Sequence, residues 1–172
     1  EAGYYAVAAL VTSFVAFGLS VTDYVFLPKI RTAHESGKRK VVQSAVNQAA
    51  RQILAMSLPI IVLLMLGGSW LLSCFGNHFS VAYVPMLLLL VGQAVEATLG
   101  LSGNLLTMYN RHAIFNRING LCLIFQFVLI IILTPYLGMT GAALASTICK
   151  IATNIMAFKK VKKLIGIRAS VI

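Results

Sequence analysis

Five long apolar runs divide this chain, and their lengths limit what it can fold into. They cover residues 4–27, 53–75, 84–107, 118–136 and 139–158. Each is close to the ~20 residues with which an α-helix crosses the hydrocarbon core of a bilayer. Hydrophobic residues make up 59% of the chain and charged residues only 10%, which excludes an ordinary soluble domain. The sequence therefore predicts an all-α, polytopic membrane helix bundle with five transmembrane helices.

Basic residues gather in every second connection between these runs. Segments 76–83 and 137–138 contain no Lys or Arg, whereas the other connections and the tail contain Lys29, Arg31, Lys38, Arg39, Lys40, Arg51, Arg111, Arg117, Lys159, Lys160, Lys162, Lys163 and Arg168. Loops rich in Lys and Arg stay on the cytoplasmic side of a membrane. We therefore expect Ser36 and the C-terminal tail with Ser170 to be cytoplasmic and Asn77 to lie on the opposite side. The formal charge of +10 then reflects topology and anionic lipid headgroups, and no nucleic acid is expected as a partner.

No pattern in the sequence indicates an enzyme. There is no Gly-rich phosphate loop and no metal-ligand spacing, and the three histidines are scattered. Cys74, Cys122 and Cys149 lie within apolar runs without disulfide spacing, so we expect them to be small buried hydrophobic residues. We thus expect neither a metal nor a cofactor. Because Glu1 stands where a start Met would, we also expect a fragment of a longer protein.

Prolines and one polar stretch set the expected helix boundaries. We expect the first helix to end where Pro28 meets Lys29. Apolar residues at helical spacing predict an amphipathic helix over 41–52, which either lies in the inner membrane interface or extends the second span into the cytoplasm. Pro59 predicts a kink within the second span. The short segment 135–138 predicts a tight antiparallel hairpin between the last two spans.

Several polar residues fall inside the apolar runs, among them Asp23, Gln93, Glu96 and Lys150. A charge at the bilayer centre costs at least ~2.5 kcal/mol and usually needs a partner or water. Helical steps of three and four place Gln93 and Glu96 on one face of the third run, and Lys150 and Asn154 on one face of the fifth. Glu96 and Lys150 both lie ~16–18 Å deep in their runs, so we expect that they can meet.

Two interpretations of these residues stay open. In the functional one, Asp23, Gln93, Glu96, Lys150 and Asn154 line or electrostatically gate a wet cavity. In the structural one, Glu96 and Lys150 form a buried pair that locks two helices, and Asp23 is an interfacial carboxylate paired with loop bases. A Lys150 that faced the cavity would favour an anionic diphosphate or an acidic sugar.

Arg111 and Arg117 lie at the inner ends of the third and fourth runs. They are candidate contacts for phosphate or lipid headgroups, although topology alone accounts for them about as well. Small residues at Gly100, Gly103 and within 138–145 suit close helix packing.

The order of several short motifs is similar to that of a known transporter family. Gly3-Tyr4-Tyr5-Ala6 opens a run that ends in Phe26-Leu27-Pro28-Lys29, and the motifs Ser57-Leu58-Pro59 and Phe75-Gly76-Asn77-His78-Phe79 follow. The stretch Pro135 to Ala145, and Leu105-Leu106-Thr107-Met108 before a basic loop, also fit. Over its whole length the chain resembles the C-terminal half of bacterial polysaccharide flippases. These are the O-antigen and capsule repeat-unit translocases of the multidrug/oligosaccharidyl-lipid/polysaccharide exporter superfamily.

This resemblance implies a transporter of two six-helix lobes that works by alternating access in the bacterial inner membrane. The chain would supply five helices of the C-terminal lobe, with the N-terminal lobe missing, and the partner would be an undecaprenyl-diphosphate-linked oligosaccharide. Alternatives are a multidrug or cation antiporter of the same superfamily and a membrane structural subunit without transport. The chain departs from the family pattern at Tyr109-Asn110, where a Gly is common, which puts the geometry of that loop in doubt.

Overall fold

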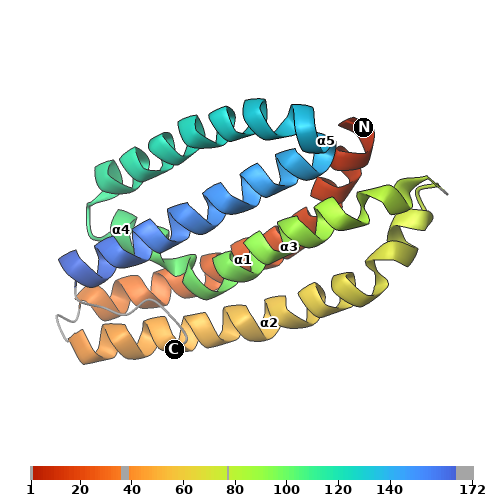
Figure 1. The fold of residues 1–172 in the computed structure, drawn as a ribbon. Helices are drawn as coiled ribbons and strands as arrows, with labels where there is room; N and C mark the ends of the chain where they lie inside the picture. Colours follow the sequence, from red (N-terminus) through yellow and green to blue (C-terminus); the bar gives the residue numbers. More distant parts are fainter. Residues whose placement is uncertain (1, 36–38, 77, 166–172) are drawn as a thin grey trace.

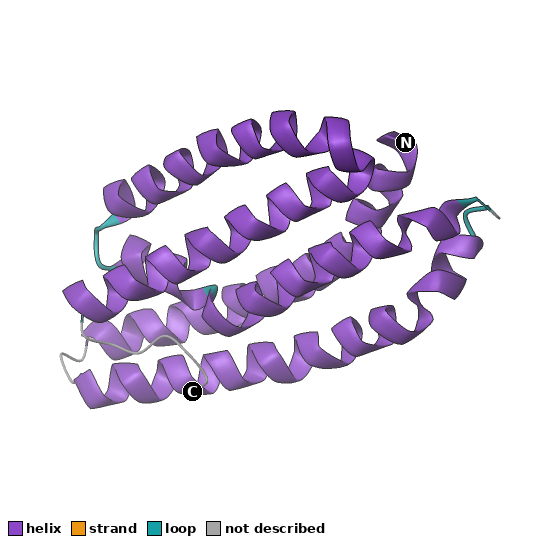
Figure 2. Ribbon diagram, in the orientation of Figure 1, coloured by secondary structure: helices purple, strands orange, loops and turns teal. Residues whose placement is uncertain are grey.

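A computed structural model describes residues 2–35, 39–76 and 78–165, and every regular element in these ranges is a helix. The side chains of residues 2, 19, 21–24, 34, 35 and 39 are outside the description. The elements are α1 (Ala2–Glu35), α2 (Arg39–Ser73), the short 3₁₀-helix η1 (Phe79–Ala82), α3 (Tyr83–Leu99), α4 (Leu101–Met108) and α5 (His112–Leu164). Figure 2 shows them as a bundle of roughly aligned rods. The predicted all-α class is confirmed for these residues.

The longest helix, α5, folds back on itself at Gly138, which takes φ 55° and ψ −135°. Glycine adopts this conformation far more easily than residues with a Cβ atom. The fold-back gives an N-terminal arm (112–137) and a C-terminal arm (139–164), which run side by side in Figure 1. The arms touch closely, because a Cβ atom at Gly141 would lie only 2.5 Å from the Leu133 carbonyl oxygen. The predicted hairpin is therefore confirmed, and its close packing requires glycine at position 141.

The two ends of the bundle differ in charge. Figure 1 shows the end of α1, the start of α2, the α4–α5 turn and the end of α5 together at one end. The α2–η1 connection and the turn of α5 lie at the opposite end. The described helix ends that flank the Lys- and Arg-containing connections thus share one end, which we call the basic end, and those that flank the connections without Lys or Arg share the other. The topological pairing read from the sequence agrees with this arrangement.

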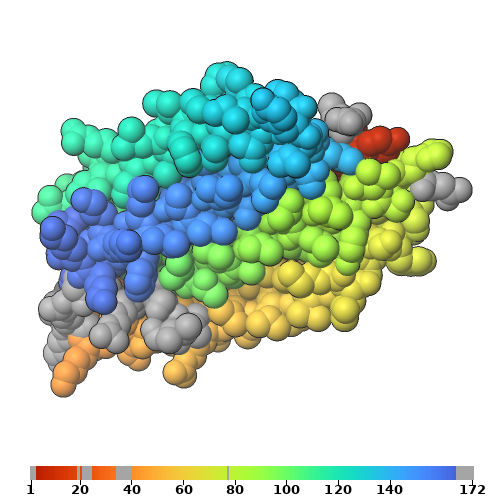
Figure 3. All heavy atoms as spheres, viewed as in Figure 1, coloured from red at the N-terminus to blue at the C-terminus, as the bar shows by residue number. Residues whose placement is uncertain are grey.

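The core lies between α1, α2 and α3, and α3 also packs against α5. Its most deeply buried side chains include Val11, Val15, Val46, Met86 and Leu90. The N-terminal arm of α5 forms the outer edge seen in Figure 3, and its exposed side chains are largely apolar, for example Leu121, Ile124, Phe127 and Ile131. In the described residues, three helices are long and apolar enough to cross a membrane: Lys40–Ser73, Phe79–Leu99 and His112–Leu164. Apolar side chains on the outside of such helices suit a lipid environment.

The first helix is longer than the sequence predicts, and the second follows one of its two predicted forms. α1 continues through Pro28 to Glu35, so the expected end at Pro28 is wrong. A proline within a helix removes one backbone hydrogen bond, and the buried side chains of Ile30 and Ala33 stabilise the turns beyond it. α2 begins at Arg39 and runs unbroken through the 41–52 segment, which is the geometry of an extension of the following span. The apolar face of that segment, Val42, Val46, Ala49 and Ala50, is buried in the core.

The predicted helix over 84–107 is divided at Gly100 into α3 and α4. The Gly100 N–H donates to the Glu96 carbonyl at 2.7 Å, whereas the Gly103 N–H donates to the Gly100 carbonyl at 3.2 Å. The second bond spans three residues instead of four, so the helix tightens locally at this position. The division places Glu96 in the last turn of α3, directly before α4.

Asn110, in the turn before Arg111, has a left-handed backbone conformation with a φ of 56°. The Arg111 N–H donates to the Leu106 carbonyl at 2.8 Å, and the Asn110 N–H donates to the Thr107 carbonyl at 3.1 Å. This bond pair is the Schellman arrangement that ends many helices. Asparagine tolerates the left-handed region better than most residues, so the turn between α4 and α5 forms without glycine.

Candidate functional site

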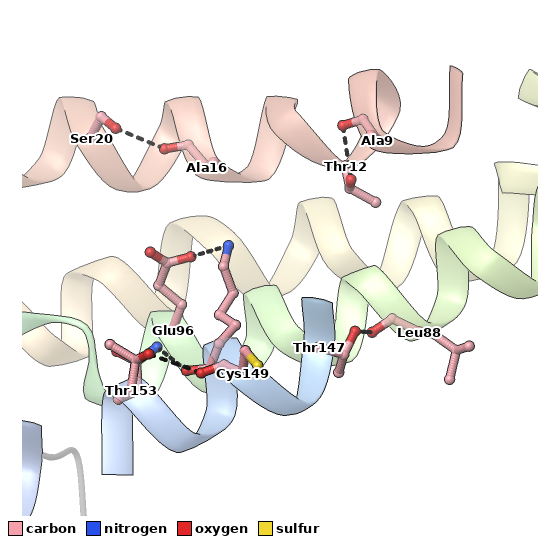
Figure 4. Close-up of polar contacts among 11 residues, drawn as sticks. Ala9, Thr12, Ala16, Ser20, Leu88, Glu96, Thr147, Cys149 and Thr153 are labelled. Atoms are coloured by element: carbon pink, nitrogen blue, oxygen red, sulfur yellow. Dashed lines mark hydrogen bonds and ion pairs between the residues drawn. The ribbon is translucent and has the colours of Figure 1, made fainter. Parts of the chain in front are cut away.

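Glu96 and Lys150 form an ion pair between α3 and the C-terminal arm of α5. Lys150 Nζ lies 2.6 Å from Glu96 Oε2. The predicted meeting of these two residues is thus confirmed. Their side chains are 34% and 36% exposed for Lys150 and Glu96, so the pair is neither fully buried nor free in solvent. Figure 4 shows the Glu96 side chain projecting from α3 toward α1, on the side where Ser20 lies.

Gln93, one helical turn before Glu96, joins the pair into a network of three side chains. The hydrogen-bonding surroundings assign its amide so that the nitrogen donates to Glu96 Oε2 at 3.1 Å and the oxygen accepts from Lys150 Nζ at 3.1 Å. The Gln93 side chain is buried. An amide that satisfies both charges at once fixes their relative position, because it offers each ion the partner that it needs.

Contacts between α3 and α5 hold this network in register. Thr147 Oγ1 donates to the Leu88 carbonyl at 2.8 Å, which ties the C-terminal arm of α5 to α3 (Figure 4). A Cβ atom at Gly92 would lie 3.4 Å from Lys150 Cδ, so the aliphatic part of Lys150 passes close over Gly92. The stem of a lysine can thus pack on apolar surface while its ammonium group stays in a polar site. A side chain larger than that of alanine at position 92 would displace Lys150.

The ion pair lies in the wall of a cavity of about 440 Å³, to which α1, α2, α3, α4 and both arms of α5 contribute. Much of the lining is polar. Besides Glu96 and Lys150, it includes the amides Asn104, Asn119, Gln126 and Asn154 and the hydroxyls of Ser20, Ser146 and Thr153. This volume lies within the range of small-molecule sites, roughly 300–1,000 Å³. The combination of uncharged hydrogen-bonding groups and one ion pair suits a polar, hydrated ligand.

Further hydrogen bonds hold the side chains of the cavity wall, and one of them reaches α1. Gln126 Nε2 donates to Ser146 Oγ at 3.2 Å, which joins the two arms of α5. The Tyr5 and Ser146 hydroxyls lie 3.3 Å apart, which joins the hairpin to α1. Asn154 Nδ2 donates to the Lys150 carbonyl at 2.9 Å and so orients its amide along the helix. The lining side chains are therefore held by polar contacts across helices as well as by apolar packing.

The structure places only some of the site residues predicted from the sequence at the cavity. Glu96, Lys150 and Asn154 line the cavity, and Gln93 stands behind the ion pair. The Asp23 side chain lies outside the described residues, and so do Ser36, Asn77 and Ser170, on which the topology was predicted. Arg111 and Arg117 are exposed near the basic end and do not line this cavity.

Sequence reasoning missed one wall of the cavity, which the N-terminal arm of α5 supplies. Phe115, Asn119, Cys122 and Gln126 all line the cavity and follow each other at steps of four, three and four. This stripe was present in the sequence. It is weaker than the others because it contains no charged residue and because its two amides alternate with a phenylalanine and a cysteine.

Among the described residues, no group of three or more His, Cys, Asp or Glu side chains is placed to hold a metal ion. No family model, curated protein or solved structure matches this chain. The functional assignment of the cavity therefore depends on its own residues and on the motifs of the sequence.

Proposed function

We propose that this chain forms five membrane-spanning helices of the C-terminal lobe of a flippase in the bacterial inner membrane. Each arm of α5 has enough residues to reach ~39 Å at 1.5 Å per residue, which exceeds the ~30 Å hydrocarbon core. α1 has 34 residues and contains the apolar stretch Gly3–Gly18. With α2 and α3, these segments make five spans. The basic end then faces the cytoplasm, and the C-terminal tail with it.

The function that we propose is the outward movement of an undecaprenyl-diphosphate-linked oligosaccharide by alternating access. The observation that carries this proposal is a polar cavity with an ion pair inside a bundle whose outer helices are apolar. A large sugar head needs a wet path through the membrane, while its lipid tail can stay in the bilayer. The family resemblance supplies the substrate class, and the N-terminal lobe would close the path from the other side.

The two alternatives fit the cavity less well. A cation or drug antiporter favours carboxylates that are available to a positive ligand, but Glu96 is already paired with Lys150 at 2.6 Å. A structural subunit would bury its polar stripes in helix contacts. Here the side chains of the ion pair remain about one third exposed and face a cavity, which supports a path for solutes.

The test is deletion of the gene for the full-length protein in a strain with no redundant flippase. We expect surface polysaccharide to be lost and lipid-linked repeat units to accumulate on the cytoplasmic leaflet, with plasmid-borne wild type as the restoring control. The minimal inhibitory concentrations of cationic drugs should not change. Intact polysaccharide together with increased drug sensitivity would instead support the antiporter, and no change in either would support the structural subunit.

A further inference from the structure

The cavity holds no net charge on its described lining. Glu96 and Lys150 are its charged lining residues in that part of the chain, and they neutralise each other across 2.6 Å. Gln93 occupies a further hydrogen-bonding position on each of them. A diphosphate that bound to Lys150 would have to displace this carboxylate and leave it without its partner. The Lys150 ammonium group is therefore a poor anion site while it is paired with Glu96.

The rest of the polar lining consists of amides and hydroxyls, which present both hydrogen-bond donors and acceptors. An amide side chain has two donor and two acceptor positions, and the bonds from Gln126 to Ser146 and from Asn154 to Lys150 each use one of them. Sugar hydroxyl and acetamido groups are likewise both donors and acceptors, so they match such a surface. Phe115 adds an apolar ring to the same wall. Gly103 makes room for this ring, because a Cβ atom there would lie 2.8 Å from Phe115 Cε2.

We propose that this cavity binds an uncharged, hydroxyl-rich sugar unit of the substrate and that the diphosphate does not bind at Lys150. The inference deepens the proposed function and rests on it. The volume of about 440 Å³ suits a small part of an oligosaccharide rather than the whole repeat unit. The proposal also reverses the expectation from the sequence that a Lys150 facing the cavity favours an anion, because Glu96 and Gln93 already contact its ammonium group.

The first experiment compares two asparagines on the N-terminal arm of α5. Asn119 lines the cavity, whereas Asn116 is exposed one helical turn away and does not line it. In the full-length protein at matched membrane levels, Asn119→Leu should lower surface polysaccharide about tenfold and Asn116→Leu should stay within about twofold of wild type. Asn119→Gln, which keeps an amide, should recover part of the loss. Equal effects of the two Leu variants would overturn the proposal.

The second experiment uses inorganic pyrophosphate as a probe of the purified full-length protein. Glu96→Gln removes the partner of Lys150 and should raise pyrophosphate affinity about tenfold, whereas the double variant Glu96→Gln/Lys150→Gln, which leaves neither charge uncompensated, should keep the wild-type affinity. A tenfold loss of affinity in the double variant relative to the wild type would place the diphosphate at Lys150 and overturn the proposal. The gene deletion separates the two levels of inference. Polysaccharide that is lost in the deletion but unaffected by Asn119→Leu refutes the sugar site alone, and polysaccharide that persists in the deletion refutes both.

Discussion

Breaking the Glu96–Lys150 pair should lower the free energy of unfolding moderately. The exposed fractions of the two side chains determine how large this effect is. Removing one partner of a fully buried pair costs about 3–5 kcal/mol, whereas exposed pairs contribute about 0.2–1 kcal/mol. The two side chains are 34% and 36% exposed, which places this pair between the limits. We expect Glu96→Gln or Lys150→Gln each to lower the free energy of unfolding by about 1–2 kcal/mol. The double variant should lose less than the sum, with a coupling energy of about 1 kcal/mol.

The assay is unfolding of the purified full-length protein in mixed micelles by titration with a denaturing detergent, repeated at low and high salt. Salt should reduce the coupling energy, because a partly exposed pair is screened. Asn116→Leu serves as a control for a polar residue of the bundle outside the network. Strict additivity of the two single effects would show that the residues are not coupled. A loss of more than about 3 kcal/mol in either single variant would show that the pair is dry.

Three further predictions follow from the backbone and the charge distribution. Gly141→Ala should destabilise the protein by about 1–3 kcal/mol in the same titration, whereas Gly120→Ala, whose Cβ would meet no atom within 4 Å, should not destabilise it. Asn110→Gly should be neutral or stabilising and Asn110→Val destabilising by about 1 kcal/mol, since the turn needs a left-handed residue. With the native cysteines replaced, a membrane-impermeant thiol reagent should label Ser80→Cys from outside intact cells and spare Thr32→Cys. Labelling of only the second position would reverse the orientation.

Run lengths and helical steps predict the parts of this fold that depend on single elements. The meeting of Glu96 with Lys150 was predictable because both lie at similar depth on polar stripes of their helices. The turn at Gly138 was predictable because a four-residue connection forces neighbouring helices to run antiparallel. The depth of each residue and the direction of a short turn can be worked out from single elements, whereas the contact itself also required α3 and the C-terminal arm of α5 to be neighbours.

Features that depend on tertiary packing were not predictable in the same way. α1 continues beyond Pro28 because Ile30 and Ala33 are buried in the core. Local helix propensity does not predict this burial. The division at Gly100 and the cavity wall from Asn119 and Gln126 depend on which faces of neighbouring helices meet. The periodicity of a single sequence does not determine which faces of neighbouring helices meet.

The charge pattern of the α5 hairpin also bears on how the chain enters a bilayer during synthesis. Segment 135–138, which forms its turn, contains no Lys, Arg, Asp or Glu, whereas Arg111 and Arg117 stand at one free end and Lys159 to Lys163 at the other. In the proposed topology, carrying this turn across the membrane therefore moves no charged side chain, and the basic residues would hold both free ends on the side where they were made. We expect the two arms to insert together as one unit. In a glycosylation assay of insertion, an acceptor site placed in the turn should be modified, and three Lys residues placed there should reduce that modification.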